Sequence, residues 1–186
     1  MTGLAFVYAG AHGPANGLGL LLDAAESVTG DLPEVEFVLV GDGADKPHLI
    51  DEAERRHLTN VRFLDPIPKA DMPELLSAAD VGLHVLADVP LFRYGVSPNK
   101  LFDYMAAGLP VVTNCPGEVE GIVNTAGAGV AVKPDDLEDA VRTVAAASSD
   151  QLTIWGHAGR SFIQQHRSRE VVAGQLAEVL NRSAAH

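Results

Sequence analysis

Short apolar runs alternate with helical patterns along most of this sequence. The run Leu4–Ala9 is continuous, which is typical of a strand buried on both faces of a parallel sheet. A glycine-rich turn follows it, and Leu18, Leu21 and Leu22 then have the spacing of a helix. The same succession recurs, with strands predicted at 4–9, 35–40, 61–64, 79–86, 110–113 and 129–132.

This alternation predicts the fold class. Strands joined through helices form right-handed βαβ units, so we expect an α/β fold with a doubly wound, Rossmann-like parallel sheet. The region from Asp150 to Leu180 is helical in pattern, with a break near Arg167 and Ser168. We see no repeat or linker and predict a single domain over residues 1–186. The first strand begins almost at once, so we expect a domain cut from a longer protein.

The composition excludes several classes of binding partner. A formal net charge of −12 argues against nucleic acid or an anionic membrane surface as a partner. No apolar run approaches the roughly 20 residues of a membrane-spanning helix, so we expect no membrane insertion. The single cysteine, Cys115, allows no intramolecular disulfide and argues against a structural zinc site. We expect a cytoplasmic protein with a small-molecule or protein partner.

The segment from Gly95 to Asn114 predicts a loop, a helix, a tight turn and a buried strand in direct succession. Ser97 is a good N-cap residue, and Pro98 then falls at the first helical position, where its missing N–H costs nothing. Gly108 is predicted to end the helix in a left-handed conformation, and an extended run follows it.

The start of this helix is a predicted anion site. Its free N–H groups and the positive end of its dipole face the preceding loop. Lys100 adds a positive charge in the first turn, and Asp103 lies within reach of hydroxyl groups on the molecule that carries the anion. These features favour a phosphate-bearing, hydroxylated ligand. Two less specific explanations are a solvated surface lysine and a first-turn acid favoured by the helix dipole.

Loops that follow parallel strands lie at one edge of the sheet, where ligands bind in such folds. In the first loop, a glycine-rich turn between strand and helix can bring backbone N–H groups to a phosphate. Its spacing matches neither the dinucleotide nor the P-loop motif, and a plain turn explains it equally well. A nucleotide is the natural occupant of this edge, and the predicted edge loops are 10–17, 41–43, 65–68 and 87–99.

Several other polar residues have structural explanations. His84 alternates with apolar neighbours and is predicted to be a buried, hydrogen-bonded histidine. Cys115 has no histidine pattern beside it and is predicted to pack in the interior. The arginines at 160, 167 and 169 are predicted to lie at a solvated helix junction.

At Ser97–Val112 the run S-P-N-K-L-F-D-Y-M-A-A-G-L-P-V-V resembles the donor-binding signature of retaining GT-B glycosyltransferases of family four. The runs F-V-Y-A-G-A-H-G-P-A-N-G-L and F-V-L-V-G-D-G look like the first two strands and the phosphate loop of that family's C-terminal domain. The most similar pattern is that of bacterial polysaccharide enzymes that transfer N-acetylated sugars. The resemblance implies the nucleotide-sugar-binding, C-terminal half of a GT-B enzyme.

The resemblance also implies roles for individual residues. Asp103 takes the position of the family's second glutamate, which holds the ribose hydroxyls. Lys100 and the helix start would stabilise the charge that develops on the diphosphate, and Lys100 and Asp103 are the predicted catalytic residues. The implied donor-binding positions are Gly10, His12, Asn16, Gly41, Ile67, Ser97, Pro98, Asn99, Lys100, Leu101 and Asp103.

The sequence departs from the family pattern in informative places. The first glutamate of the family's pair would stand at Gly95 and is absent. His12 and Asn16 lie where a basic pair is common, which leaves Lys100 as the charge on the diphosphate. The family's N-terminal acceptor domain is missing, so we do not expect this chain to complete turnover alone.

The expected reaction of the full enzyme is transfer of a hexose-type sugar from a nucleoside diphosphate, UDP being favoured, with retention of configuration. The acceptor would be a glycan or a lipid-linked molecule in polysaccharide biosynthesis, and no metal or other cofactor is expected. Two other functions remain open, half of a nucleotide-sugar epimerase and a non-catalytic nucleotide-binding module. Product analysis would identify the first, and measured turnover would exclude the second.

Overall fold

The computed structural model describes residues 3–89, 92, 96 and 98–184. Six parallel strands form one sheet in the order β3-β2-β1-β4-β5-β6. The order reverses between β1 and β4, so the predicted doubly wound α/β sheet is confirmed. The strands are β1 (Leu4–Ala9), β2 (Val35–Val40), β3 (Val61–Leu64), β4 (Val81–His84), β5 (Val111–Thr113) and β6 (Gly129–Ala131).

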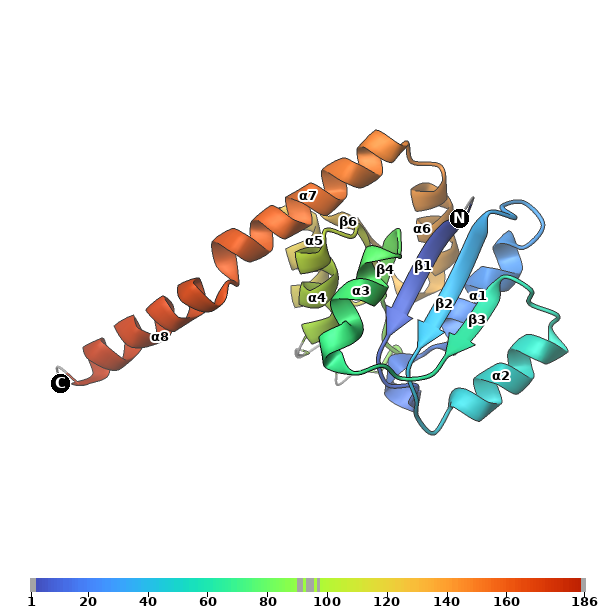
Figure 1. Ribbon diagram of the computed structural model, residues 1–186, viewed down its shortest axis with the longest axis horizontal. Coiled ribbons are helices and arrows are strands. Elements are labelled where there is room, and N and C mark those ends of the chain that lie inside the picture. Colours follow the sequence, from blue (N-terminus) through green and yellow to red (C-terminus); the bar gives the residue numbers. More distant parts are fainter. Residues whose placement is uncertain (1–2, 90–91, 93–95, 97, 185–186) are drawn as a thin grey trace.

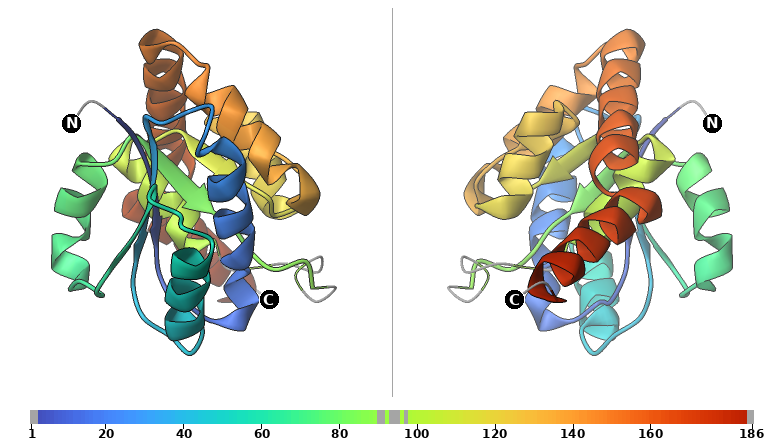
Figure 2. Two further views of the ribbon diagram at one scale, coloured as in Figure 1. Left: turned by 90° about the vertical axis from the view of Figure 1, so that its right-hand side faces the viewer. Right: turned by 90° about the vertical axis from the view of Figure 1, so that its left-hand side faces the viewer.

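Helices cover both faces of this sheet (Figures 1 and 2). Short 3-10 turns at Pro14–Asn16, Lys69–Asp71 and Pro134–Asp136 precede α1, α3 and α6. The helices are α1 (Gly19–Val28), α2 (Lys46–Arg55), α3 (Met72–Ser77), α4 (Asn99–Ala107), α5 (Glu118–Ala126), α6 (Leu137–Ala145), α7 (Ser149–His166) and α8 (Arg169–Ala184).

The central strand β1 contributes to the core on both faces of the sheet. Successive side chains of a strand point to opposite faces. Phe6 and Tyr8 pack with buried residues of α1, α2 and α6, whereas Val7 and Ala9 pack with those of α3, α4 and α5. All four side chains are buried, as the continuous apolar run predicts.

The strand β4 is shorter than the predicted run 79–86. Beyond His84 the chain leaves the ladder, because the Asn114 side chain takes both backbone groups of Leu86. Its Oδ1 accepts from the Leu86 N–H at 2.9 Å, and its Nδ2 donates to the Leu86 carbonyl at 2.9 Å. A side-chain amide thus replaces the backbone partners that a longer strand would need.

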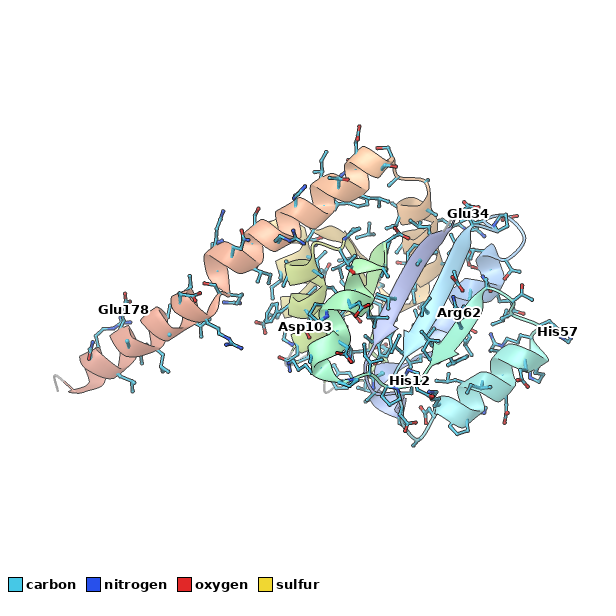
Figure 3. The ribbon with its side chains drawn as sticks, viewed as in Figure 1. His12, Glu34, His57, Arg62, Asp103 and Glu178 are labelled. Carbon is cyan, nitrogen blue, oxygen red and sulfur yellow. The ribbon has the colours of Figure 1, made fainter. Side chains whose placement is uncertain are left out.

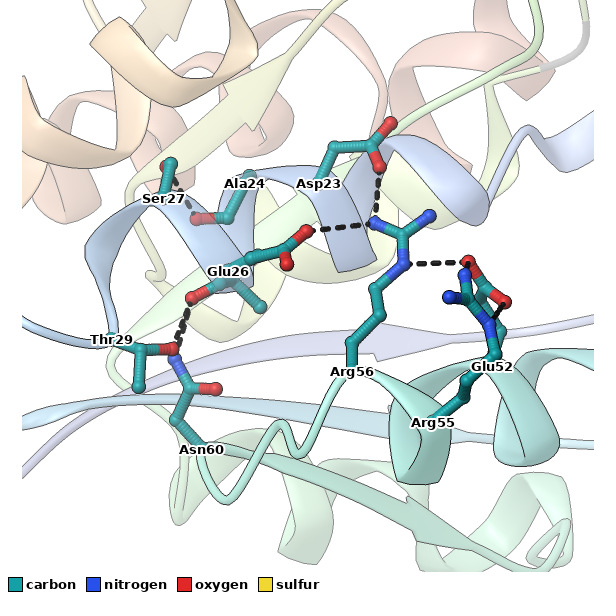
Figure 4. A network of polar contacts seen from close by, with 10 residues as sticks. Asp23, Ala24, Glu26, Ser27, Thr29, Glu52, Arg55, Arg56 and Asn60 are labelled. Carbon is teal, nitrogen blue, oxygen red and sulfur yellow. Dashed lines mark hydrogen bonds and ion pairs between the residues drawn. The ribbon is translucent and has the colours of Figure 1, made fainter.

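An ion-pair network joins α1 to the end of α2 (Figure 4). The Arg56 guanidinium lies 2.6 Å from Asp23, 3.2 Å from Glu26 and 2.6 Å from Glu52. Hydrogen bonds from Arg55 and Arg56 lower the pKa of Glu52 to about 2. The network fixes α1 against α2 on the face of the sheet that they share.

The helix α4 differs from its prediction at one end. It begins at Asn99, so Pro98 precedes the helix instead of being its first residue, and the predicted cap, Ser97, lies outside the described residues. Gly108 ends the helix with φ +81°, as predicted. Arg160 of α7 is exposed, as predicted, and its guanidinium also donates to the carbonyls of Ala106 and Ala107.

The C-terminal helices break where the sequence predicts a break, since α7 ends at His166 and α8 begins at Arg169. Helix α8 extends away from the sheet and its covering helices (Figure 1). Among the helices of the described residues, none has both the length and the apolar character needed to traverse a bilayer. The large exposed apolar side chains of α8 are Val172, Leu176, Val179 and Leu180.

Candidate functional site

The loops after β1 and β2 touch one another at the carboxyl edge of the sheet. The Gly10 N–H donates to the Val40 carbonyl at 2.9 Å. Gly41 has φ +145°, and a Cβ there would lie 1.9 Å from the Gly10 carbonyl oxygen. Only glycine fits at position 41, because both the backbone angle and the close approach exclude a side chain. The predicted positions Gly10 and Gly41 therefore form one surface.

The Lys100 side chain, in the first turn of α4, lies over the loop that follows β1. Its Nζ donates to Asn16 Oδ1 at 3.3 Å and lies 5.1 Å from the ring centroid of Tyr8. A Cβ at Gly10 would lie 3.0 Å from Lys100 Cδ and 3.3 Å from Nζ. The structure thus brings together three of the predicted site residues, Gly10, Asn16 and Lys100.

The charge of Lys100 is only partly compensated. Its side chain is half-buried, and burial lowers the pKa of the ammonium. Within the described part of the chain, no carboxylate lies within ion-pair distance of Nζ. A half-buried cation without a counterion, in the first turn of a helix, favours the binding of an anion.

Beneath Lys100 lies a buried polar group at the ends of β4 and β5. His84 Nδ1 is 3.3 Å from Thr113 Oγ1, as expected for a hydrogen-bonded interior histidine. Burial, with a smaller effect of Lys100, lowers the pKa of His84 to about 4. Burial also raises the pKa of the Cys115 thiol to about 11. Both groups are therefore uncharged at neutral pH, and Cys115 does not have the lowered pKa of a nucleophilic cysteine.

His12 lies inside the protein. Its side chain is 0% exposed, with its ring 5.9 Å from that of Tyr8 and 6.2 Å from that of Phe63. Neither ring nitrogen has a hydrogen-bond partner among the described residues. Burial and the nearby Lys46 lower the pKa of His12, and the Val40 backbone and the Asp42 carboxylate offset part of this effect. The predicted contact of this ring with a diphosphate does not fit its enclosed position.

The backbone of His12 joins the loops after β1 and β2. Its N–H donates to the Asp42 carbonyl at 2.8 Å, and its own carbonyl accepts from the Asp45 N–H at 2.9 Å. A single loop residue without a helical or strand period carries no signal for which way its side chain turns. The sequence therefore did not predict that the imidazole turns into the interior.

A cavity of about 260 Å³ lies between the loops that follow β2 and β3. The predicted positions Gly41 and Ile67 both line it. Ile67 is half-buried, and no backbone hydrogen bond of its N–H or carbonyl is seen within the described residues. A planar base with hydrogen-bonding edges suits such a cavity. The lining residues are Gly10, Ala11, Val40, Gly41, Asp42, Pro66, Ile67 and Met72.

The remaining predicted positions lie along α4. Asp103 is exposed and makes no hydrogen bond or ion pair with the part of the chain that the structure describes, so its carboxylate is available to a ligand (Figure 3). Asn99 is exposed at the helix start, and Pro98 is buried. Leu101 is 0% exposed and packs in the core, so its side chain is closed to a ligand.

A larger cavity, of about 750 Å³, lies beside the ends of β5 and β6. Among the described residues, its lining includes four acidic residues, Asp88, Glu120, Asp135 and Asp136, and one basic residue, Lys133. None of the predicted site residues that the structure describes lines it. A diphosphate would be repelled by this concentration of acidic groups. The electrostatics therefore favour the smaller cavity and Lys100 over the larger volume.

Residues 3–150 match the protein-family model described as glycosyl transferases group 1. The chain belongs to this family. No curated protein matches it. The group 1 assignment confirms the coarse prediction of a glycosyltransferase, and it covers β1 to β6 with the loops described above.

Solved structures of glycosyltransferases share the fold of this group 1 domain. HepE from Anabaena, solved with UDP, is 21% identical with a TM-score of 0.80, over 97% of this chain and 49% of that one. Sucrose-phosphate synthase from Thermosynechococcus elongatus is 20% identical with a TM-score of 0.79, over 98% of this chain and 46% of that one. The C-terminal domain of LpcC from Francisella tularensis is 15% identical with a TM-score of 0.73, over 90% of this chain and 87% of that one. These likenesses confirm the C-terminal half of a GT-B fold.

The chain spans about half the length, or less, of several of these structures. It covers 44% of WaaG, a glycosyltransferase of lipopolysaccharide biosynthesis, and 36% of TarM from S. aureus.

Proposed function

We propose that this domain binds the nucleotide-sugar donor of a retaining glycosyltransferase and that the donor is a UDP-sugar. The diphosphate would lie at the start of α4, against Lys100 and the loop after β1. The base would occupy the cavity between Gly41 and Ile67, and the ribose hydroxyls would meet Asp103. This arrangement places one ligand across three loops of a single sheet edge.

The observation that carries the proposal is the position of Lys100. Its half-buried ammonium donates to Asn16, lies beside Gly10 and lacks a carboxylate counterion within the described residues. Burying a cation costs free energy unless a negative group approaches it, and a diphosphate supplies that group. Similar structures that contain UDP or UDP-glucose favour this ligand over other phosphates.

The chemistry that the site can perform is stabilisation of a leaving group. When the bond between the sugar and the diphosphate breaks, negative charge grows on the diphosphate oxygens. The Lys100 ammonium and the positive end of α4 interact more strongly with that charge than with the intact donor. The proposal needs no metal for this step, because the lysine and the helix dipole supply positive charge.

The acceptor would come from elsewhere. We propose that a second domain, equivalent to the other half of the GT-B relatives, supplies the acceptor site and that this domain alone is inactive in transfer. The exposed apolar residues Val172, Leu176 and Leu180 on α8 favour contact with further protein. A glycan or lipid-linked acceptor in polysaccharide biosynthesis, an N-acetylated hexose as the transferred sugar and a cytoplasmic location complete the proposal.

Calorimetric titration of this chain with UDP, GDP and ADP tests the proposal. We expect UDP to bind more tightly than the other two nucleotides, because the base contacts the cavity walls and the diphosphate is common to all three. Asp103→Ala should weaken UDP binding without lowering the melting temperature. Equal affinities for the three nucleotides, or no binding of any, would contradict the proposed donor site.

A further inference from the structure

Lys46, a residue outside the predicted site, joins the two strands that flank the base-sized cavity. It is the first residue of α2, and its side chain is only 12% exposed. Its Nζ donates to the Gly41 carbonyl at 2.8 Å, to the Leu64 carbonyl at 2.9 Å and to Asp65 Oδ1 at 3.2 Å. An ammonium has three protons, so all of its donors are used within the protein.

The bonds of Lys46 lie where the ladder between β2 and β3 ends. The last paired residues are Val40 and Leu64, and the Gly41 N–H still donates to the Leu64 carbonyl at 3.2 Å. Beyond this point the segments that follow β2 and β3 separate, and the cavity opens between residues 41–42 and residues 66–67. Lys46 joins the two segments at the point where they separate.

We propose that Lys46 is a positioning residue for the nucleobase, because it sets the distance between the Gly41 wall and the Ile67 wall of the cavity. Lys46 does not line the cavity, so it acts through the carbonyls that it binds. The inference rests on the proposed function and assigns a base-specific role to a lysine other than Lys100. The two lysines act on opposite ends of the nucleotide.

The His12 ring supports the same wall from inside the protein. A Cβ at Gly41 would lie 3.3 Å from His12 Nε2, so the ring packs directly beneath Gly41. The charged groups that face the ring within the described residues are Lys46 of α2 and Asp42 of the loop after β2, and the uncharged rings of Tyr8 and Phe63 lie beside it. Lys46 therefore favours the neutral, packed form of His12 as well as binding Gly41 directly.

Two probes distinguish binding of the base from binding of the phosphates. UDP affinity is measured by calorimetry, and inorganic pyrophosphate affinity by NMR titration of the ¹⁵N-labelled chain. Lys46→Met removes the donors and keeps the length of the side chain. We expect it to weaken UDP binding about tenfold, which equals 1.4 kcal/mol. Pyrophosphate affinity should stay within about twofold of the wild type, because Lys100 is untouched. Lys133→Met, which removes an exposed lysine at the larger cavity, should change neither affinity.

Lys46→Gln retains an amide with two N–H donors and is expected to cause a smaller loss of UDP affinity. It also provides the comparison if Lys46→Met does not fold. Unchanged UDP affinity in either variant, or equal losses for UDP and pyrophosphate, would overturn the positioning role. Failure of the proposed function has a different signature, because the wild-type chain would then bind no UDP at all, and the role of Lys46 would be overturned with it.

Discussion

Lys100 Nζ lies 3.3 Å from Asn16 Oδ1, although 84 positions of sequence separate the two residues. One belongs to the first turn of α4 and the other to the short 3-10 turn after β1. Their contact brings the start of a helix and a glycine-rich loop together around one ammonium that has no carboxylate counterion within the described residues. This relationship defines the candidate diphosphate site.

Lys100→Met is expected to weaken binding of both UDP and inorganic pyrophosphate by about 10- to 100-fold, as for a lost hydrogen bond to a charged group. The contrast with Lys46→Met, which should spare pyrophosphate, distinguishes the phosphate end from the base end. Lys100→Arg keeps the charge and should retain part of the affinity. Wild-type affinity for pyrophosphate in Lys100→Met would contradict the assignment.

Asp103→Asn is expected to reduce the preference of the site for ribose hydroxyls. The wild-type chain should bind UDP more tightly than 2′,3′-dideoxy-UDP, and the variant should lose most of that difference, about tenfold in affinity. The unfolding free energy should not change, because the carboxylate is exposed and bonds to no described residue. If UDP and its dideoxy analogue bind the wild type equally, Asp103 does not contact the ribose.

Gly41→Ala is expected to destabilise the fold by about 2 kcal/mol or more, because position 41 combines a positive φ with contact against the Gly10 carbonyl. Gly121→Ala is the matched control. That glycine lies inside α5, and an added Cβ meets no atom within 4 Å. The control should gain up to about 1 kcal/mol from helix propensity. Urea unfolding of both variants gives the comparison, and equal stabilities would contradict the close contact.

The lowered pKa of His84 predicts how the free energy of unfolding changes with pH. Its folded pKa, about 4, lies below the usual value of 6.5, so the unfolded chain binds the proton more readily between these values. The free energy of unfolding should therefore fall as the pH drops from 6.5 to 4, by up to about 3 kcal/mol from this residue. His12 acts in the same direction.

Urea unfolding at pH 7.5, 5.5 and 4 measures this effect. His84→Asn keeps a polar atom near Thr113 and removes the titrating group, so its stability should depend less on pH than that of the wild type. A variant with the full acid sensitivity of the wild type would show that His84 is not responsible.

The sequence predicted the sheet because each strand is a short apolar run between helices of clear period. It also predicted the end of α4, since Gly108 is a residue that tolerates a positive φ. Contacts between distant segments were not predictable. Arg160 donates to Ala106, 54 positions away, and Lys46 to Leu64, 18 positions away, and neither pair leaves a local pattern.

The candidate site, like the fold, was predictable from the sequence only in part. Lys100, Gly10 and Asn16 were predictable as neighbours because strand ends in a parallel sheet share one edge. The inward turn of His12 and the burial of Leu101 were not, because they depend on how the loop and helix pack. Met72 lines the base-sized cavity without any motif that singles it out.

An NMR titration of the ¹⁵N-labelled chain with UDP reports directly on where the nucleotide binds. The donor-site assignment predicts saturable shifts of the backbone amide signals of Gly10, Gly41 and Ile67, together with those of the first turn of α4 at Lys100. Signals of Gly117 and Lys133, at the larger acidic cavity, should not move. Shifts confined to that cavity, or no shifts at millimolar UDP, would contradict the account.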